Sequence, residues 1–263
     1  MRRRFLFGFA LVLAVSATTA APAFAQSLAL YGVVLMHGKG GHPGGPIGGV
    51  AAALKSAGAT VVMPEMPWSR ARMYDASYSG AMMQIDAAVK RLRAEGKRRI
   101  VIGGMSFGAN AAIGYATQHG DIAAVLALSP GHTPELAGFQ KALADSVAKA
   151  RQLLAGGKGD IRTTFGDLNQ GHRFQVSATP KVYLSYFDPH GPASMTANAA
   201  AMKPVPIFMA VGTRDRIVSR ARGQFFRPAA KNRKSKYVEV PGGTHMNTPG
   251  HVASDVVAWL AGL

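Results

Sequence analysis

Three short motifs place a serine, an aspartate and a histidine beside glycines. They are GMSFG around Ser106, VGTRD ending at Asp215 and PGGTH ending at His245. Nucleophilic catalysis combines these three side chains: the serine attacks, the histidine takes and returns its proton, and the aspartate orients the imidazole. We therefore treat Ser106, Asp215 and His245 as a candidate catalytic triad.

The serine motif alone is a weak signal, because a serine before a helix is also a common N-cap that contributes about 1 kcal/mol. Here an apolar run rich in β-branched residues, RRIVIGG, precedes Ser106, and small helix-forming residues from Ala109 to Thr117 follow it. Glycine at positions 104 and 108 leaves room for a strained turn that exposes the hydroxyl. This context favours a strand-to-helix turn that carries a nucleophile.

Apolar stretches typical of strands alternate with helical stretches from Leu30 onward. The strands are LYGVVLMHG, ATVVMPEM, RRIVIGG, IAAVLALSP, VPIFMAVGTRD and SKYVEVPGG. Between the fourth and fifth strands, residues 131–203 contain a helical stretch and a polar loop but no convincing strand. The alternation predicts an α/β fold with a doubly wound, mainly parallel sheet of about six strands. Residues 131–203 would form a cap insertion.

The three candidate residues each follow a different strand of this sheet. In a doubly wound sheet, reactive groups gather at the carboxyl ends of the strands. The chain order serine, acid, histidine is also the order expected for a nucleophile on a strand-to-helix turn. We therefore expect the three side chains to meet at one edge of the sheet.

The loop MHGKGG, residues 36–41, follows the first strand and supplies candidate hydrogen-bond donors. Acyl transfer needs backbone N–H groups that stabilise an oxyanion, and we expect them from Phe107 and from Lys39 or Gly40. The rival interpretation is a phosphate-binding loop. It fails because glycine rather than serine or threonine follows Lys39, and because Pro43 takes the last position of G-x-G-x-x-G.

Taken together, HGKGG, GMSFG, the cap insertion, GTRD and GGTH resemble the serine hydrolases of the α/β-hydrolase superfamily, over residues 30–263. The resemblance implies a small, exported, esterase-like hydrolase that cleaves carboxylic esters through an acyl-enzyme without a cofactor. Two departures stand out. The antiparallel strands that open larger members are missing, and Lys39 takes a place where an apolar residue is more usual.

Other functions remain open at this point. Thioesterase, lysophospholipase and peptidase chemistry use the same triad, and a catalytically silent scaffold could act as a binding protein. Met105 and Met246, beside the motifs, and Trp68, on the loop after the second strand, are candidates for substrate binding, with core packing as the alternative. A modest cap and an apolar pocket favour short to medium acyl chains.

Asp188 and His190, in YFDPHGP, are rivals for the acid and the base. Both lie in the cap insertion, where we expect a capping or turn role for Asp188. His37 is expected to support the glycine loop. The other histidines have no spacing that indicates a metal site and are interpreted as surface or loop residues: His42, His119, His132, His172 and His251.

The N-terminus has the pattern of an export signal. A basic MRRRF, an apolar FLFGFALVLAV and a cleavage site of the A-x-A type, AFA, precede Gln26. We expect residues 1–25 to be a signal peptide, residues 26–263 to be the hydrolase domain, and the mature protein to be periplasmic or secreted.

The chain of 263 residues has no cysteine and a formal net charge of +17. The lack of cysteine excludes disulfides, thiolate metal sites and a cysteine nucleophile. The basic residues are dispersed and no aromatic ladder accompanies them, so specific nucleic-acid binding is not expected. Weak electrostatic association with anionic membrane surfaces is expected, whereas the oligomeric state is open.

Overall fold

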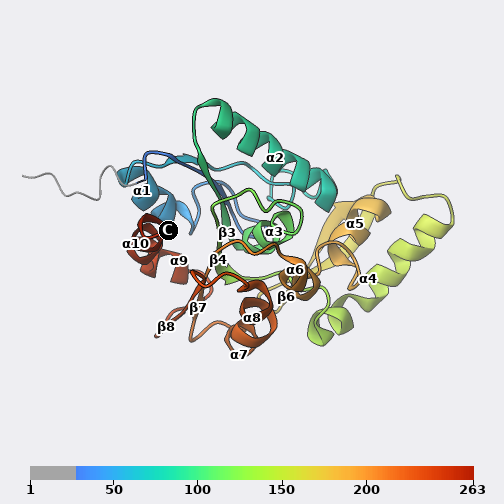
Figure 1. The fold of residues 1–263 in the computed structure, drawn as a ribbon. Helices are drawn as coiled ribbons and strands as arrows, with labels where there is room; N and C mark the ends of the chain where they lie inside the picture. Colours follow the sequence, from blue (N-terminus) through green and yellow to red (C-terminus); the bar gives the residue numbers. More distant parts are fainter. Residues whose placement is uncertain (1–27) are drawn as a thin grey trace, which may run out of the picture.

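The computed structural model describes residues 28–263 and contains a six-stranded sheet whose adjacent strands are all parallel (Figure 1). The predicted signal peptide, residues 1–25, lies outside the described residues. The strands of the sheet are β1 (Tyr31–Met36), β2 (Thr60–Val62), β3 (Arg99–Ser106), β4 (Ala124–Pro130), β7 (Ile207–Gly212) and β8 (Lys236–Val240). The prediction of a doubly wound parallel sheet is thus confirmed.

The strand order β2-β1-β3-β4-β7-β8 contains a topological switch point between β1 and β3. The chain leaves β1 toward β2 on one side and then returns to build the rest of the sheet on the other. The two strands pair in register up to Met36 opposite Gly104. Ligands of such sheets bind at the carboxyl ends of the strands beside the switch point, which is where the loop after β1 and the turn after β3 emerge.

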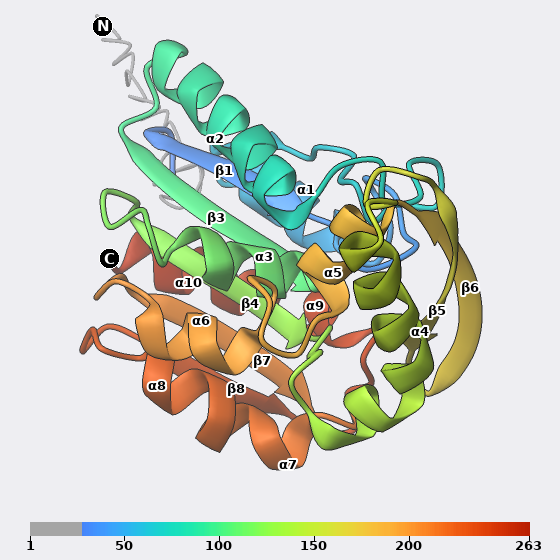
Figure 2. The same ribbon diagram turned by 90° about the vertical axis from the view of Figure 1, so that its right-hand side faces the viewer.

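Helices cover both faces of the sheet (Figure 2). On one face, α1 (Gly48–Ser56), α9 (Thr248–His251) and α10 (Ala253–Ala261) lie against the alternate apolar residues of the strands. The opposite face packs against α2 (Tyr78–Ala94), α3 (Phe107–Tyr115), α6 (Met195–Ala201), the π-helical segment η2 (Ala221–Phe226) and α8 (Arg227–Ala229). Because both faces are covered, β1 and β4 are fully buried, as continuous apolar runs predict.

The sequence of α2 shows how the helices are specified. Ser77 caps its first turn, because its hydroxyl accepts a hydrogen bond from the Gly80 N–H at 3.2 Å. Ile85, Val89 and Leu92 recur at helical spacing and are buried against the sheet.

No helix within residues 28–263 is long and apolar enough to cross a membrane.

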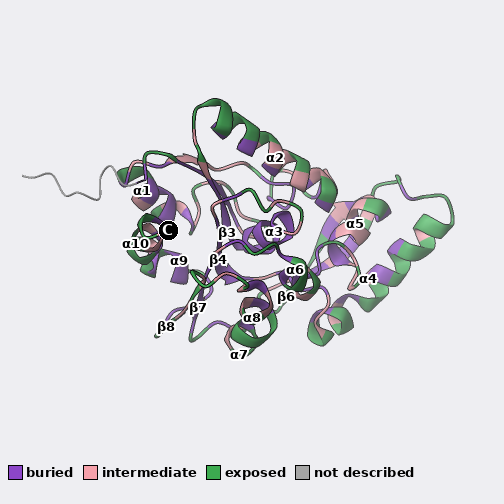
Figure 3. Cartoon of the chain, in the orientation of Figure 1, coloured by how far each residue is buried: buried purple, intermediate pink, exposed green. Residues whose placement is uncertain are grey.

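The cap insertion differs from the sequence prediction. It contains α4 (Ala137–Ala155), α5 (Pro180–Phe187) and an antiparallel hairpin of β5 (Thr163–Asn169) and β6 (His172–Ala178), where no strand was expected. Figure 2 shows these elements gathered beyond one end of the sheet, with the outer side of α4 exposed (Figure 3). In β5 the inward positions are Phe165 and Asp167, so a charged residue interrupts the alternation of apolar and polar residues that would reveal a strand.

The last part of the insertion also differs from the prediction. Helix α6 contacts α3 and η2 and contributes Met195 and Ala199 to the core beside the sheet. The segment that covers the carboxyl end of the sheet is therefore shorter than residues 131–203. It consists of α4, α5 and the β5–β6 hairpin.

Candidate active site

Ser106 ends β3 and immediately precedes α3, with a backbone φ of 55°. A non-glycine residue in this region is strained, and the surrounding structure must hold it there. The turn places the hydroxyl at the start of α3, where backbone N–H groups are free of intrahelical partners. This is the geometry expected of a nucleophile on a strand-to-helix turn.

Two close backbone approaches explain the glycines around Ser106. A Cβ on Gly104 would lie 2.5 Å from the backbone of Gly108, and a Cβ on Gly108 would lie 2.4 Å from the carbonyl oxygen of Met36. The backbones of Met36 and Gly104 are fixed by the pairing of β1 with β3 in the middle of the sheet, and α3, which carries Gly108, packs directly on these strands. Glycine at these positions permits the sharp turn, as the motif predicted.

Asp215 follows β7 and His245 follows β8, and the two side chains meet. Asp215 Oδ2 lies 2.7 Å from His245 Nδ1, and both side chains are buried. A carboxylate at Nδ1 keeps the proton on that nitrogen and leaves Nε2 free to accept one. Within the described part of the chain, His245 Nε2 is buried and has no hydrogen-bond partner.

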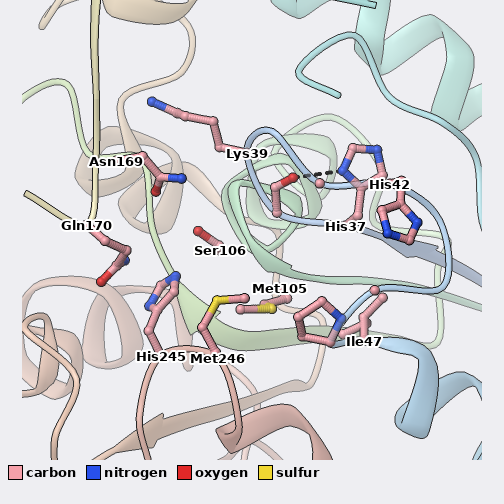
Figure 4. A pocket seen from close by; sticks show the side chains of 14 residues that line it. His37, Lys39, His42, Ile47, Met105, Ser106, Asn169, Gln170, His245 and Met246 are labelled. Carbon is pink, nitrogen blue, oxygen red and sulfur yellow. Dashed lines mark hydrogen bonds between the residues drawn. The ribbon is translucent and has the colours of Figure 1, made fainter. Parts of the chain in front are cut away.

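Gly131 shows that the serine and the histidine face the same point. A Cβ on Gly131 would lie 2.7 Å from Ser106 Oγ and 3.4 Å from His245 Cε1. The Gly131 N–H also donates to the Ser106 carbonyl at 3.1 Å. The structure therefore brings Ser106, Asp215 and His245 together at the carboxyl ends of three strands (Figure 4 shows Ser106 and His245).

The loop after β1 passes directly over the serine. A Cβ on Gly38 would lie 3.1 Å from Ser106 Cβ. The Gly40 N–H, one of the two alternatives for an oxyanion donor, is already bound to the carbonyl oxygen of Trp68 at 2.8 Å. That alternative is therefore wrong. The N–H groups of Lys39 and Phe107 remain as the donor pair, and within residues 28–263 neither donates a hydrogen bond outside helices and strands.

His37 holds this loop in place, as the sequence suggested. Its Nε2 accepts the Met66 N–H at 3.0 Å, so its Nδ1 carries the proton and donates to the Gly38 carbonyl at 2.8 Å. The Trp68 indole donates to the His37 carbonyl at 2.9 Å. Burial lowers the pKa of His37, which favours the neutral imidazole that this arrangement requires.

Residues 33–258 match the model of the alpha/beta hydrolase family. The chain belongs to the α/β-hydrolase family. This confirms the resemblance inferred from HGKGG, GMSFG, GTRD and GGTH.

Solved structures with the α/β-hydrolase fold include a chain reported with LipS and LipT, two metagenome-derived lipolytic enzymes (16% identity, 92% of this chain, 99% of that chain, TM-score 0.65). Another is the monoacylglycerol lipase of Paleococcus ferrophilus (23% identity, 90% and 96% of the chains, TM-score 0.65). A third is the esterase domain of a Rhodothermus marinus protein (13% identity, 89% and 88%, TM-score 0.58). At these identities the likeness concerns the fold. No curated protein matches the sequence significantly.

The Lys39 side chain of this α/β-hydrolase forms an ion pair that the sequence did not reveal. Its ammonium points away from Ser106 (Figure 4) and lies 2.5 Å from Asp167 Oδ1 of β5, with side-chain exposures of 4% and 0%. Tyr74 donates to the other carboxylate oxygen at 3.0 Å, and the Leu168 N–H donates to the first at 2.6 Å. Burial lowers the pKa of Lys39, and the neighbouring carboxylate opposes that shift.

Aromatic rings surround this pair. Lys39 Nζ lies 5.1 to 5.8 Å from the ring centroids of Phe107, Phe139 and Phe187. Lys39, a candidate oxyanion donor, is thus tied through its side chain to the β5–β6 hairpin of the cap. Neither Asp167 nor Tyr74 was a candidate from sequence. The one available signal was the unusual lysine in HGKGG.

Two cavities meet at Ser106. The small pocket has a volume of about 230 Å³ and is lined mainly by the loop after β1, Ile47, Met105, Met246 and the hairpin tip at Asn169 and Gln170. The wide cleft has a volume of about 560 Å³ and lies on the side of α4 and α7 (Val218–Arg220). Figure 4 shows Asn169 and Gln170 facing Ser106 across the site.

The predicted substrate-binding residues have different positions. Met105 and Met246 line the small pocket, and Met246 is 56% exposed. Trp68 lines neither cavity that contains Ser106. It is 1% exposed and stacks on Phe107 with ring centroids 4.6 Å apart. The expectation of substrate contact is wrong for Trp68, which instead supports the oxyanion loop from behind.

His132 also departs from the prediction of a surface or loop histidine. It lies on a loop but is buried, stacked on Phe107 at 3.8 Å between ring centroids. Burial lowers its pKa well below the usual value, so the ring is neutral.

No group of three or more potential metal ligands occurs within residues 28–263.

The rival acid Asp188 has the turn role expected of it. It accepts the His190 N–H at 3.0 Å and forms a bidentate ion pair with Arg151.

We expect Asp215→Asn to lower kcat by about 10⁴-fold, because the amide favours the wrong imidazole tautomer, and Asp188→Asn to change kcat less than about twofold. Steady-state kinetics on one chromogenic ester compare the two. A larger loss for Asp188→Asn would contradict the assignment.

Proposed function

We propose that this protein is a serine hydrolase that cleaves carboxylic esters through an acyl-enzyme intermediate, without a cofactor. The observation that carries the proposal is the position of Ser106 on a strained turn, next to the buried His245–Asp215 pair. Within residues 28–263, the N–H groups of Lys39 and Phe107, which adjoin Gly38 and Ser106 in the chain, donate no hydrogen bond outside helices and strands. Nucleophile, base, orienting acid and oxyanion donors are the complete set for acyl transfer.

The chemistry follows from this arrangement. Ser106 Oγ attacks the ester carbonyl while His245 Nε2 takes the hydroxyl proton, and the carbonyl oxygen becomes an oxyanion beside the Lys39 and Phe107 N–H groups. When the C–O bond to the alcohol breaks, His245 returns the proton to the leaving oxygen. Water then attacks the acyl-enzyme with the same base and releases the acid and Ser106.

The small pocket supports short to medium acyl chains. At about 230 Å³ it is below the usual size of drug-like ligand sites, which begin at roughly 300 Å³. Ile47 and Met105 give it an apolar wall with space for a few methylenes. The fold neighbours described as lipolytic enzymes, a monoacylglycerol lipase and an esterase domain agree with ester chemistry.

A series of p-nitrophenyl esters from acetate to palmitate tests this proposal. Each buried methylene contributes about 0.8 kcal/mol, so kcat/KM should rise about fourfold per methylene until the pocket is full and then fall. The Ser106→Ala variant provides the background rate. The greatest kcat/KM on palmitate would contradict the proposed chain length, and activity on anilides without activity on esters would contradict the proposed reaction.

A further inference from the structure

Two arginines line the wide cleft beside the candidate triad. Arg216 and Arg220 follow β7 and are four residues apart, and Gln224 comes four residues later. Arg216 lies in the turn before α7, Arg220 ends α7 and Gln224 lies in the following segment, and all three line the cleft. The chain continues into the π-helical segment η2, a rare conformation that occurs preferentially at functional sites. The cleft therefore has one wall with two guanidinium groups.

These guanidinium groups have no acidic partner among the described residues. Within residues 28–263, neither Arg216 nor Arg220 forms an ion pair. Asp215 is the only acidic side chain among the described residues that line the cleft, and it is bound to His245. The cleft is consequently positive beside the nucleophile.

Arg216 is held in place by the hairpin. Its Nη1 donates to the Gln170 carbonyl at 3.2 Å, and a Cβ on Gly171 would lie 1.9 Å from the same nitrogen. The guanidinium thus approaches Gly171, a turn glycine with φ of 84°, so closely that a side chain there would collide with it. Within the described part of the chain this is the one hydrogen bond of the Arg216 side chain, so its other donors are available for an oxyanion. A planar, fixed guanidinium is well suited to bidentate binding of carboxylate or phosphate.

The cleft also opens onto the reacting atoms. Gly131 lines the cleft but not the small pocket. Gly131 has no side chain and lies next to both Ser106 Oγ and His245 Cε1. A group bound in the cleft can therefore approach these two residues from the side of Gly131. The small pocket, with its apolar wall of Ile47 and Met105, is the better site for an acyl chain.

We propose that the wide cleft binds the alcohol half of an ester whose alcohol bears a carboxylate or phosphate group, and that Arg216 and Arg220 bind that group. This inference rests on the proposed ester-hydrolase function and adds the substrate class. The acyl half occupies the small pocket, so the scissile carbonyl lies over Ser106 between them.

A matched pair of chromogenic esters tests the subsite. The anionic probe is 3-butyryloxy-4-nitrobenzoate and the neutral probe is 2-nitrophenyl butyrate, which differ by one carboxylate on the alcohol. The measured quantity is the anionic-to-neutral ratio of kcat/KM. We expect a ratio above one at low salt that falls as salt is added. In Arg216→Gln/Arg220→Gln the ratio should fall about tenfold.

The control variant is Arg233→Gln, which removes the same charge from an exposed site outside the cleft. It should leave the ratio unchanged. A ratio that falls equally in Arg233→Gln, or that does not change in the double variant, would overturn the subsite. Hydrolysis of the neutral ester with rejection of the anionic one would overturn the subsite alone. Failure to hydrolyse either ester would overturn the ester-hydrolase proposal itself.

Two further probes place the anion. Mono-4-nitrophenyl succinate carries its carboxylate on the acyl half, and 4-butyryloxyphenyl phosphate carries a phosphate on the alcohol half. Arginine-dependent preference confined to the succinate would contradict the assignment of the cleft to the alcohol. The loss of kcat/KM in Arg216→Gln/Arg220→Gln is then compared between the phosphate ester and the benzoate ester. The larger loss identifies whether the arginines bind phosphate or carboxylate better.

Discussion

Ser106→Ala is expected to lower kcat on p-nitrophenyl butyrate by roughly a million-fold, leaving only the background from the remaining groups. The substitution removes one oxygen atom from the turn at the carboxyl end of β3, so the free energy of unfolding should change by less than about 1 kcal/mol. Circular dichroism and urea unfolding provide that control. His245→Ala should have a similar effect on kcat.

The double variant Ser106→Ala/His245→Ala distinguishes a working triad from independent contributions. Residues that act as one unit are strongly non-additive, so the double variant should lose little more activity than either single variant. Labelling with a fluorophosphonate and mapping of the modified peptide gives a second readout. A label on a serine other than Ser106 would contradict the assignment.

Single substitutions in the Lys39–Asp167 pair are expected to cost about 3–5 kcal/mol of unfolding free energy, because each leaves a buried charge without its partner. The variants are Lys39→Met and Asp167→Asn. Together they remove both charges, so Lys39→Met/Asp167→Asn should be more stable than the sum of the single effects predicts. Urea unfolding monitored by tryptophan fluorescence measures all three.

The exposed pair Lys181–Asp160 is the matched control, with side-chain exposures of 56% and 80%. Lys181→Met and Asp160→Asn should each cost at most about 1 kcal/mol. If substitutions in the two pairs lowered the free energy of unfolding by equal amounts, burial would not strengthen the interaction between Lys39 and Asp167. Additive effects in Lys39→Met/Asp167→Asn would lead to the same conclusion.

Much of the fold was predictable because local patterns and global topology agree. Most of the six parallel strands are short apolar runs, and the GMSFG turn needs its glycines for reasons of backbone contact alone. Once the strands were placed, Asp215 and His245 had to emerge at the same sheet edge as Ser106. Chain order and topology were therefore enough to bring the three residues together.

The details that were not predicted depend on tertiary contacts with no local signature. Strand β5 was missed because Asp167 occupies a buried position, and that position is stable only because Lys39, more than a hundred residues away, lies against it. The choice between Lys39 and Gly40 depended on a hydrogen bond to Trp68. The same loop contact places Trp68 behind the site rather than in it.

The ion pair between Lys39 and Asp167 also determines how a substrate reaches the nucleophile. Swinging the β5–β6 hairpin outward would separate two buried charges, at a cost of several kcal/mol. We therefore expect the β5–β6 hairpin to stay in place while a substrate enters the site. On that expectation, the dimensions of the two cavities that border Asn169 and Gln170, and not an opening motion of the hairpin, limit the size of the substrate that is admitted.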